Sequence, residues 1–186
     1  MAGREIVQGR PCEVRSLLDR VNGACTSLGP KSRDYTEAQP FRSSGDLTLA
    51  TITDIAEAFF TACETGKGWE SCSRYCTADA TFSAQAEPLL DLTSLAQYTD
   101  WMKGIITVLP DARYEVKSFA TDTKRNNVCA FAVFHGTHTG PGGPVAPTGR
   151  RVSTDYVYVM QFDGDKIVHM TKIWHSGLAL KDLGWT

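Results

Sequence analysis

The chain has 186 residues, of which 42% are hydrophobic and 22% are charged, an ordinary composition for a globular protein with a sizeable core. Nineteen lysines and arginines stand against 21 acidic residues, so the net charge is −2. Because nucleic-acid binders usually carry a basic face, this balance argues against a nucleic-acid partner. No apolar run approaches the roughly 18–20 residues that span a bilayer, so we expect no membrane partner either.

The N-terminus has no continuous apolar segment of the kind that forms a signal peptide, and six cysteines are too few for a disulfide scaffold. We therefore expect a cytoplasmic protein with reduced thiols. Cys72 and Cys76 are four residues apart and could supply half of a metal site. No second pair has suitable spacing, so buried thiols are the preferred interpretation and no metal is predicted.

Taken in chain order, residues 1–45 are predicted to form an N-terminal extension. Apolar residues at helical spacing indicate a short helix over residues 14–21, and a polar segment without periodicity follows as a linker. Residues 46–186 are expected to form the domain.

Apolar residues at helical spacing predict three helices in the first half of this domain. The first covers residues 49–63 and ends at Gly66, and the second covers residues 69–76. The third runs from about residue 93 to residue 109, where Pro110 stops it. A short strand is expected between the second and third helices, over residues 80–84.

The chain after Pro110 has β character throughout. Asn126–Asn127 and Asp163–Gly164 lie at two joints and favour hairpins, so consecutive strands should pair antiparallel. The fold class is therefore α+β, with a curved antiparallel sheet packed against three N-terminal helices. The four expected strands cover residues 113–121, 128–138, 151–162 and 166–175.

Two of these strands carry apolar residues on both faces, over residues 128–134 and 152–162. An antiparallel sheet with one solvated face should instead alternate apolar and polar residues. One face can pack on the helices, and a second copy of the protein is the simplest cover for the other. This pattern predicts a homodimer that forms through the sheet.

A loop rich in glycine and proline covers residues 139–149, between the second and third long strands. Loops this long and irregular are usually functional or mobile, and this one should overhang one end of the sheet. It lacks the Gly-Lys-Ser/Thr ending of a phosphate-binding loop.

Three titratable residues are candidates for acid–base catalysis. His138 enters the glycine-rich loop, His175 ends the last strand, and Asp155 lies within a strand whose other face is aromatic. An imidazole titrates near neutral pH, and apolar walls raise the pKa of a carboxyl group, so each could transfer protons. The simpler interpretation is hydrogen-bonded histidines and an aspartate that reaches solvent or pairs with Arg150 or Arg151.

Aromatic side chains are numerous enough to line a cavity for a flat apolar ligand, although each could equally be an ordinary core residue. A curved sheet closed by helices on one side leaves room for such a cavity. The candidate ligand-binding residues from this group and its surroundings are Phe82, Trp101, Phe134, His135, Tyr158 and Trp174.

Residues 134–149, the Asp163–Gly164 turn and residues 180–185 together resemble the SnoaL-like polyketide cyclase family. The resemblance extends over residues 47–186. It implies the cone-shaped α+β fold of nuclear transport factor 2, a small apolar or aromatic molecule as partner, and no cofactor.

In these cyclases an aspartate near the end of the last strand acts as acid and base in an aldol ring closure. The position that matches it is Ser176, which adds Ser176 to the candidate ligand-binding residues, and His175 precedes it. Two functions follow from the resemblance. The first is a cyclase, isomerase or dehydratase that acts on an apolar carbonyl compound through His138, Asp155 and His175. The second is a non-catalytic ligand-binding or dimeric scaffold domain that has lost the acid–base aspartate.

Overall fold

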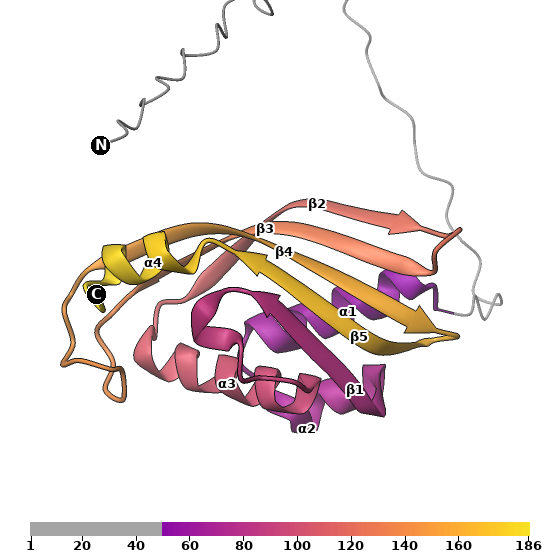
Figure 1. Ribbon diagram of the computed structural model, residues 1–186, viewed down its shortest axis with the longest axis horizontal. Coiled ribbons are helices and arrows are strands. Elements are labelled where there is room, and N and C mark those ends of the chain that lie inside the picture. Colours follow the sequence, from indigo (N-terminus) through magenta and orange to yellow (C-terminus); the bar gives the residue numbers. More distant parts are fainter. Residues whose placement is uncertain (1–49) are drawn as a thin grey trace, which may run out of the picture. The chain divides into compact units, whose positions relative to one another are not determined.

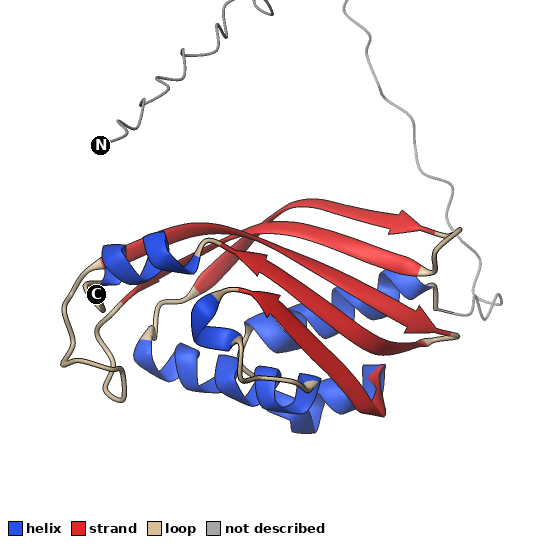
Figure 2. Ribbon diagram, in the orientation of Figure 1, coloured by secondary structure: helices blue, strands red, loops and turns tan. Residues whose placement is uncertain are grey.

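The computed structural model describes residues 50–186, which form a single layer of strands with helices packed against it (Figures 1 and 2). The predicted N-terminal extension, residues 1–45, lies outside the described residues. Among the helices of residues 50–186, none is both long and apolar enough to cross a membrane.

The three predicted helices are confirmed, with small shifts at their ends. Helix α1 spans Ile52–Glu64, α2 spans Gly68–Cys72, and α3 spans Leu95–Val108. The 3-10 turn η1, Ser73–Tyr75, continues α2, and a second turn, η2, covers Glu87–Leu89. Helices α1 and α3 each begin at a capping box, in which an N-cap hydroxyl accepts a backbone N–H.

All five predicted strands are present and form one sheet in the order β1-β5-β4-β3-β2. Every neighbouring pair is antiparallel except β1 and β5, which run parallel. The predicted α+β fold class is confirmed, and the four strands expected after Pro110 pair antiparallel as predicted, whereas β1 makes the sheet mixed because it joins β5 in parallel. A parallel pair needs a crossover rather than a hairpin, and the whole chain between β1 and β5 supplies it. The strands are β1 Cys76–Gln85, β2 Arg113–Asp122, β3 Asn127–Thr137, β4 Arg151–Asp163 and β5 Lys166–Trp174.

A fourth helix, α4, was not predicted from the sequence; it spans Ser176–Leu183 and follows β5 directly. His175 caps its N-terminus, and Gly184 ends it with a φ of 73°, a left-handed conformation that glycine adopts without strain. Helix α4 lies at the end of the sheet where the loop between β3 and β4 turns back (Figure 1).

The core lies between the inner face of the sheet and helices α1–α3. In the central pair of strands, small residues of β3 stand opposite large residues of β4, as Ala130 does to Tyr158 and Ala132 to Tyr156. This pairing lets the aromatic rings of β4 cross above β3 and reach the helices, where Phe60 of α1 stacks on Tyr156.

Candidate functional site

A cavity of about 540 Å³ lies between α3, α4, the loop before β4 and the inner face of the sheet. This volume suits a small organic ligand. Its wall is mainly apolar and aromatic. The lining residues are Pro88, Trp101, Met102, Gly104, Ile105, Val108, Leu109, Phe134, Gly142, Gly143, Pro144, Val152, Thr154, Tyr156, Lys172, Trp174, Ala179, Leu180, Leu183 and Trp185.

The glycine-rich loop forms one wall of this cavity. The N–H of Gly140 donates to the carbonyl oxygen of Val108 over 3.0 Å, which ties the loop to the end of α3. A Cβ atom at Gly140 would lie 1.9 Å from the carbonyl oxygen of Thr107, so only glycine permits this approach. The loop then contributes Gly142, Gly143 and Pro144 to the wall.

His138 is fully buried behind this loop and is not among the lining residues. Its Nδ1 accepts hydrogen bonds from the indole N–H of Trp185 at 3.0 Å and from the backbone N–H of Thr148 at 3.3 Å. His138 therefore joins the loop to the C-terminal segment. Its Nε2 has no hydrogen-bond partner within residues 50–186.

The other two predicted catalytic residues lie outside the cavity. Asp155 is exposed on the outer face of the sheet, opposite Val133 of β3. His175 is exposed, and its Nδ1 accepts the backbone N–H of Leu178 over 3.1 Å as the cap of α4. The structure does not bring His138, Asp155 and His175 together in the cavity, because strand alternation and helix α4 direct their side chains elsewhere, and a catalytic role for these residues stays a prediction.

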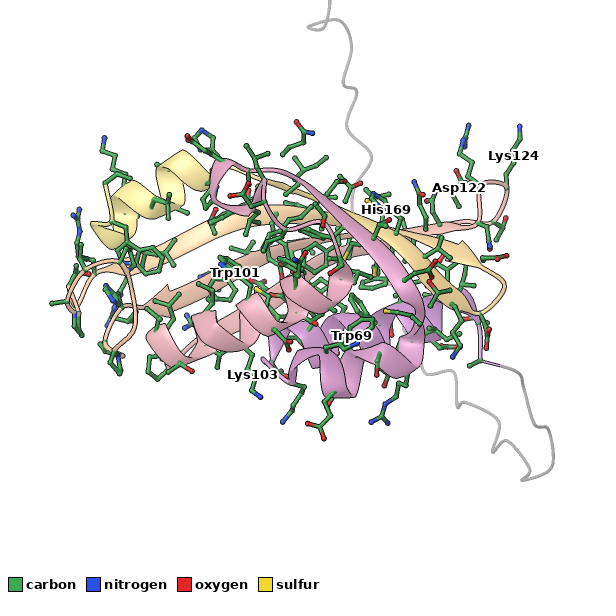
Figure 3. All side chains as sticks on the ribbon, turned by 60° about the horizontal axis from the view of Figure 1, so that its bottom comes forward. Trp69, Trp101, Lys103, Asp122, Lys124 and His169 are labelled. Carbon is green, nitrogen blue, oxygen red and sulfur yellow. The ribbon has the colours of Figure 1, made fainter. Side chains whose placement is uncertain are left out.

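Three of the predicted ligand-binding residues line the cavity: Trp101, Phe134 and Trp174. Figure 3 shows Trp101 on the side of α3 that faces the sheet. The other four do not line it. Phe82 and Tyr158 are buried in the core against Tyr98, His135 is half-buried in β3, and Ser176 is buried at the start of α4.

Lys172 of β5 is the only charged residue among those that line the cavity in the described chain. It is 7% exposed, and its Nζ donates a hydrogen bond of 2.8 Å to the hydroxyl of Tyr98 on α3. Five aromatic rings surround the Nζ, with centroids at 5.0 Å (Tyr156), 5.2 Å (Tyr98), 5.2 Å (Trp174), 5.4 Å (Tyr158) and 6.0 Å (Trp101). Such ring faces stabilise a cation by electrostatic attraction.

A chain of hydrogen bonds links Lys172 to a second buried charge. The hydroxyl of Tyr98 is hydrogen-bonded to that of Tyr158, which donates to Oε1 of Glu64 at the end of α1. Glu64 is 3% exposed. Within the described residues, Oε2 of Glu64 and the hydroxyl of Tyr156 have no hydrogen-bond partner.

Burial shifts the pKa values of both charged ends toward their neutral forms. Desolvation lowers the pKa of Lys172 from 10.5, although the charge of Glu64 opposes this shift. Desolvation raises the pKa of Glu64 from 4.5, opposed by Lys172 and by the hydrogen bond from Tyr158. The two residues can therefore exchange one proton through the two tyrosines without changing the net charge of the core.

The sequence carried a signal for both residues that its analysis overlooked. Glu64 follows Ala56 and Phe60 at intervals of four residues, so it continues the apolar stripe of α1. Lys172 alternates with Met170 and Trp174, which places it on the inner face of β5. The signal is the same in both elements. A charged residue stands where the pattern of buried residues predicts an apolar one.

Residues 50–186 contain no group of three or more His, Cys, Asp or Glu side chains that could hold a metal ion. The thiols of Cys72 and Cys76 are both buried. Burial raises the pKa of each to about 12, which keeps them protonated at neutral pH.

Comparison with known proteins gives a family match and a consistent fold. Residues 53–181 match the family model described as SnoaL-like polyketide cyclase. Among curated proteins, no match was found.

Three solved structures illustrate the likeness in fold. AclR of Streptomyces galilaeus, a proposed hydroxylase, is 24% identical, with a TM-score of 0.55 over 71% of this chain and 83% of AclR. IdmH of Streptomyces antibioticus, a proposed polyketide cyclase, is 19% identical, with a TM-score of 0.58 over 73% and 99%. A SnoaL-like polyketide cyclase of Agrobacterium tumefaciens is 18% identical, with a TM-score of 0.53 over 72% and 97%.

Proposed function

Since this chain belongs to the SnoaL-like polyketide cyclase family, we propose that it binds a flat, mostly apolar carbonyl compound in its cavity and transfers protons to and from it. The observation that carries the proposal is Lys172, the single charged group in a mainly apolar and aromatic wall of the described domain. An apolar ligand with one polar oxygen fits this distribution of wall chemistry.

Lys172 can serve both halves of a proton transfer next to a carbonyl group. Its ammonium form donates to the carbonyl oxygen and stabilises the negative charge that develops when an α-proton leaves. Its neutral form accepts a proton, and the tyrosine chain to Glu64 provides the exchange between the two forms. This arrangement supplies the acid–base function that the serine at position 176 cannot supply.

The second candidate function is ligand binding without catalysis. It is favoured by Ser176 at the position of the family's acid–base aspartate, and by His138 and His175, whose Nδ1 atoms are engaged in structural hydrogen bonds.

Binding can be tested with acetonaphthone, a flat aromatic ketone, against ethylnaphthalene, which lacks the oxygen. Three of the four tryptophans of the chain line the cavity, so both ligands should quench tryptophan fluorescence. The ketone should bind more tightly, and Lys172→Met should remove that preference because Met keeps the length of the side chain without its charge. Trp69→Phe is the matched control, since Trp69 lies outside the cavity (Figure 3). A protein that binds neither compound would contradict the proposal.

Proton transfer can be tested by exchange of the methyl hydrogens of acetonaphthone in deuterium oxide, followed by NMR. We expect exchange above the buffer rate, with a loss of at least about 100-fold in Lys172→Met, because positioned acid–base groups contribute on the order of 100-fold or more. Binding without exchange would instead support the non-catalytic function.

A further inference from the structure

The wall of the cavity holds one primary amine, that of Lys172, among mainly apolar and aromatic side chains. Lys172 extends from the inner face of β5 into an apolar wall, and its Nζ is held from one side by the hydroxyl of Tyr98. We propose that Lys172 forms a covalent imine with the ketone or aldehyde bound in the cavity, an inference that rests on the function proposed above.

The buried chain of hydroxyls can supply the neutral amine that this reaction requires. Lys172 donates to Tyr98, and Tyr158 donates to Glu64, so a proton can pass from the ammonium group to the carboxylate. The transfer replaces two buried charges by two neutral groups. Because desolvating separated charges is costly, the low-dielectric surroundings favour this neutral pair. A desolvated lysine in an apolar pocket is activated as a nucleophile in this manner.

The covalent step balances with the groups present. The lone pair of Nζ forms a bond to the carbonyl carbon as the carbon–oxygen π bond breaks, and one of the two Nζ protons moves to the oxygen to give a carbinolamine. The second Nζ proton then leaves with the hydroxyl group as water, which yields the neutral imine. The proton stored on Glu64 can return through Tyr158 and Tyr98 to make the iminium ion. No oxidant or reductant is required.

The surroundings of Nζ suit an iminium ion as well as an ammonium ion. The five ring centroids within 6.0 Å stabilise a positive charge whichever group carries it. The apolar wall also limits the access of the water that would hydrolyse the imine. An iminium ion withdraws electrons from the neighbouring carbon more strongly than a ketone does, so it would assist the removal of an α-proton.

Reductive trapping tests the proposal on the full-length chain. Naphthaldehyde and sodium cyanoborohydride convert an imine at neutral pH into a stable secondary amine, which adds the mass of the aldehyde less one oxygen atom. Peptide mapping should place the adduct at Lys172 with at least ten times the rate found at Lys103. Lys103 is exposed on α3 and points away from the cavity (Figure 3), so it reports the reactivity of a surface lysine.

Three variants sharpen the test. Lys172→Met should abolish the fast labelling, whereas Lys103→Met should leave it unchanged. Glu64→Gln keeps the side chain's size but removes the proton acceptor, so it should slow labelling at Lys172. Labelling at Lys172 that is no faster than at Lys103 in the wild-type chain would overturn the proposal, whether or not Lys172→Met folds.

Binding of methylnaphthalene, which cannot form an imine, separates failure of this inference from failure of the proposed function. If methylnaphthalene quenches tryptophan fluorescence and no selective adduct forms, the imine is excluded while ligand binding stands. If neither methylnaphthalene nor naphthaldehyde binds, the proposed function fails and this inference fails with it.

Discussion

Two charged side chains in the core dominate the chemistry at the scale of single residues. Neither Lys172 nor Glu64 has the other as a direct partner, and two tyrosine hydroxyls stand between them. The native state therefore stabilises their charged forms less well than water does. The poorer stabilisation of the two charges lowers the stability of the folded state and raises the reactivity of both groups. Groups with shifted pKa values of this kind are common at the functional sites of proteins.

The raised pKa of Glu64 predicts a dependence of stability on pH. Just above pH 4.5 the unfolded chain loses the Glu64 proton while the folded chain still holds the protons of both Glu64 and Lys172, so the free energy of unfolding falls as pH rises until the buried pair releases its first proton. Each proton retained contributes a slope of about 1.4 kcal/mol per pH unit. Glu64→Gln should remove this fall, as measured by urea denaturation at a series of pH values from 4.5 upward. The ionisable groups that face Glu64 are Cys63 of α1, Tyr98 of α3, Tyr156 and Tyr158 of β4, and Lys172 of β5.

Glu115→Gln is the matched control for this measurement. Glu115 is exposed on β2, and Lys117 lowers its pKa below 4.5, so its titration contributes only at more acidic pH. Parallel stability curves for the wild type and Glu64→Gln above pH 4.5 would contradict the assignment of the slope to Glu64.

At the scale of elements, the loop at residues 139–149 depends on one close contact. The Cβ of an alanine at Gly140 would meet the Thr107 carbonyl oxygen at 1.9 Å, so Gly140→Ala must displace the loop from α3. We expect a loss of about 1–3 kcal/mol in unfolding free energy, together with weaker binding of acetonaphthone, because the displaced loop removes part of the cavity wall.

Gly177→Ala provides the comparison for Gly140→Ala. Gly177 lies in α4, and its nearest contact for an added Cβ is 3.9 Å away, so alanine should stabilise the helix by about 0.5–1 kcal/mol. Thermal denaturation of both variants would measure this contrast. Equal effects of the two substitutions would show that the contact with Thr107 does not hold the loop.

Patterns within short stretches of the sequence predicted most helices and strands, but not which elements far apart in the sequence pack against each other. Strand alternation and hairpin residues located β2–β5, since both signals lie within a few residues of each other. The parallel pairing of β1 with β5 joins segments about ninety residues apart, which no local pattern records. Lys172 and Glu64 were missed for the same reason. Each departs from the apolar pattern of its own element, and the two are connected only when α1, α3 and β5 pack together.

At the scale of the whole molecule, the outer face of the sheet carries an apolar patch. Phe131, Val157 and Ile173 are direct neighbours across β3, β4 and β5, and Val133 and Val159 extend the same face. Phe131 is 36% exposed and Ile173 is 49% exposed. The homodimer expected from the sequence remains a prediction, and this patch is the surface on which it would form. Contiguous apolar surface of this kind is usually covered by a partner.

A second copy is the expected partner, because a two-fold axis through the sheet would place the patch of one chain on the same patch of the other. Static light scattering should then give about twice the chain mass of 20.4 kDa. Phe131→Lys, which places a charge at the centre of the patch, should shift the protein to the monomer. Val145→Lys should not, since Val145 is 42% exposed but lies in the loop between β3 and β4, next to Pro144 of the cavity wall, and not in the sheet. The cavity lies against the inner face of the sheet, so the monomeric variant should still bind acetonaphthone. A monomeric wild-type protein would contradict the prediction that the outer patch forms a homodimer.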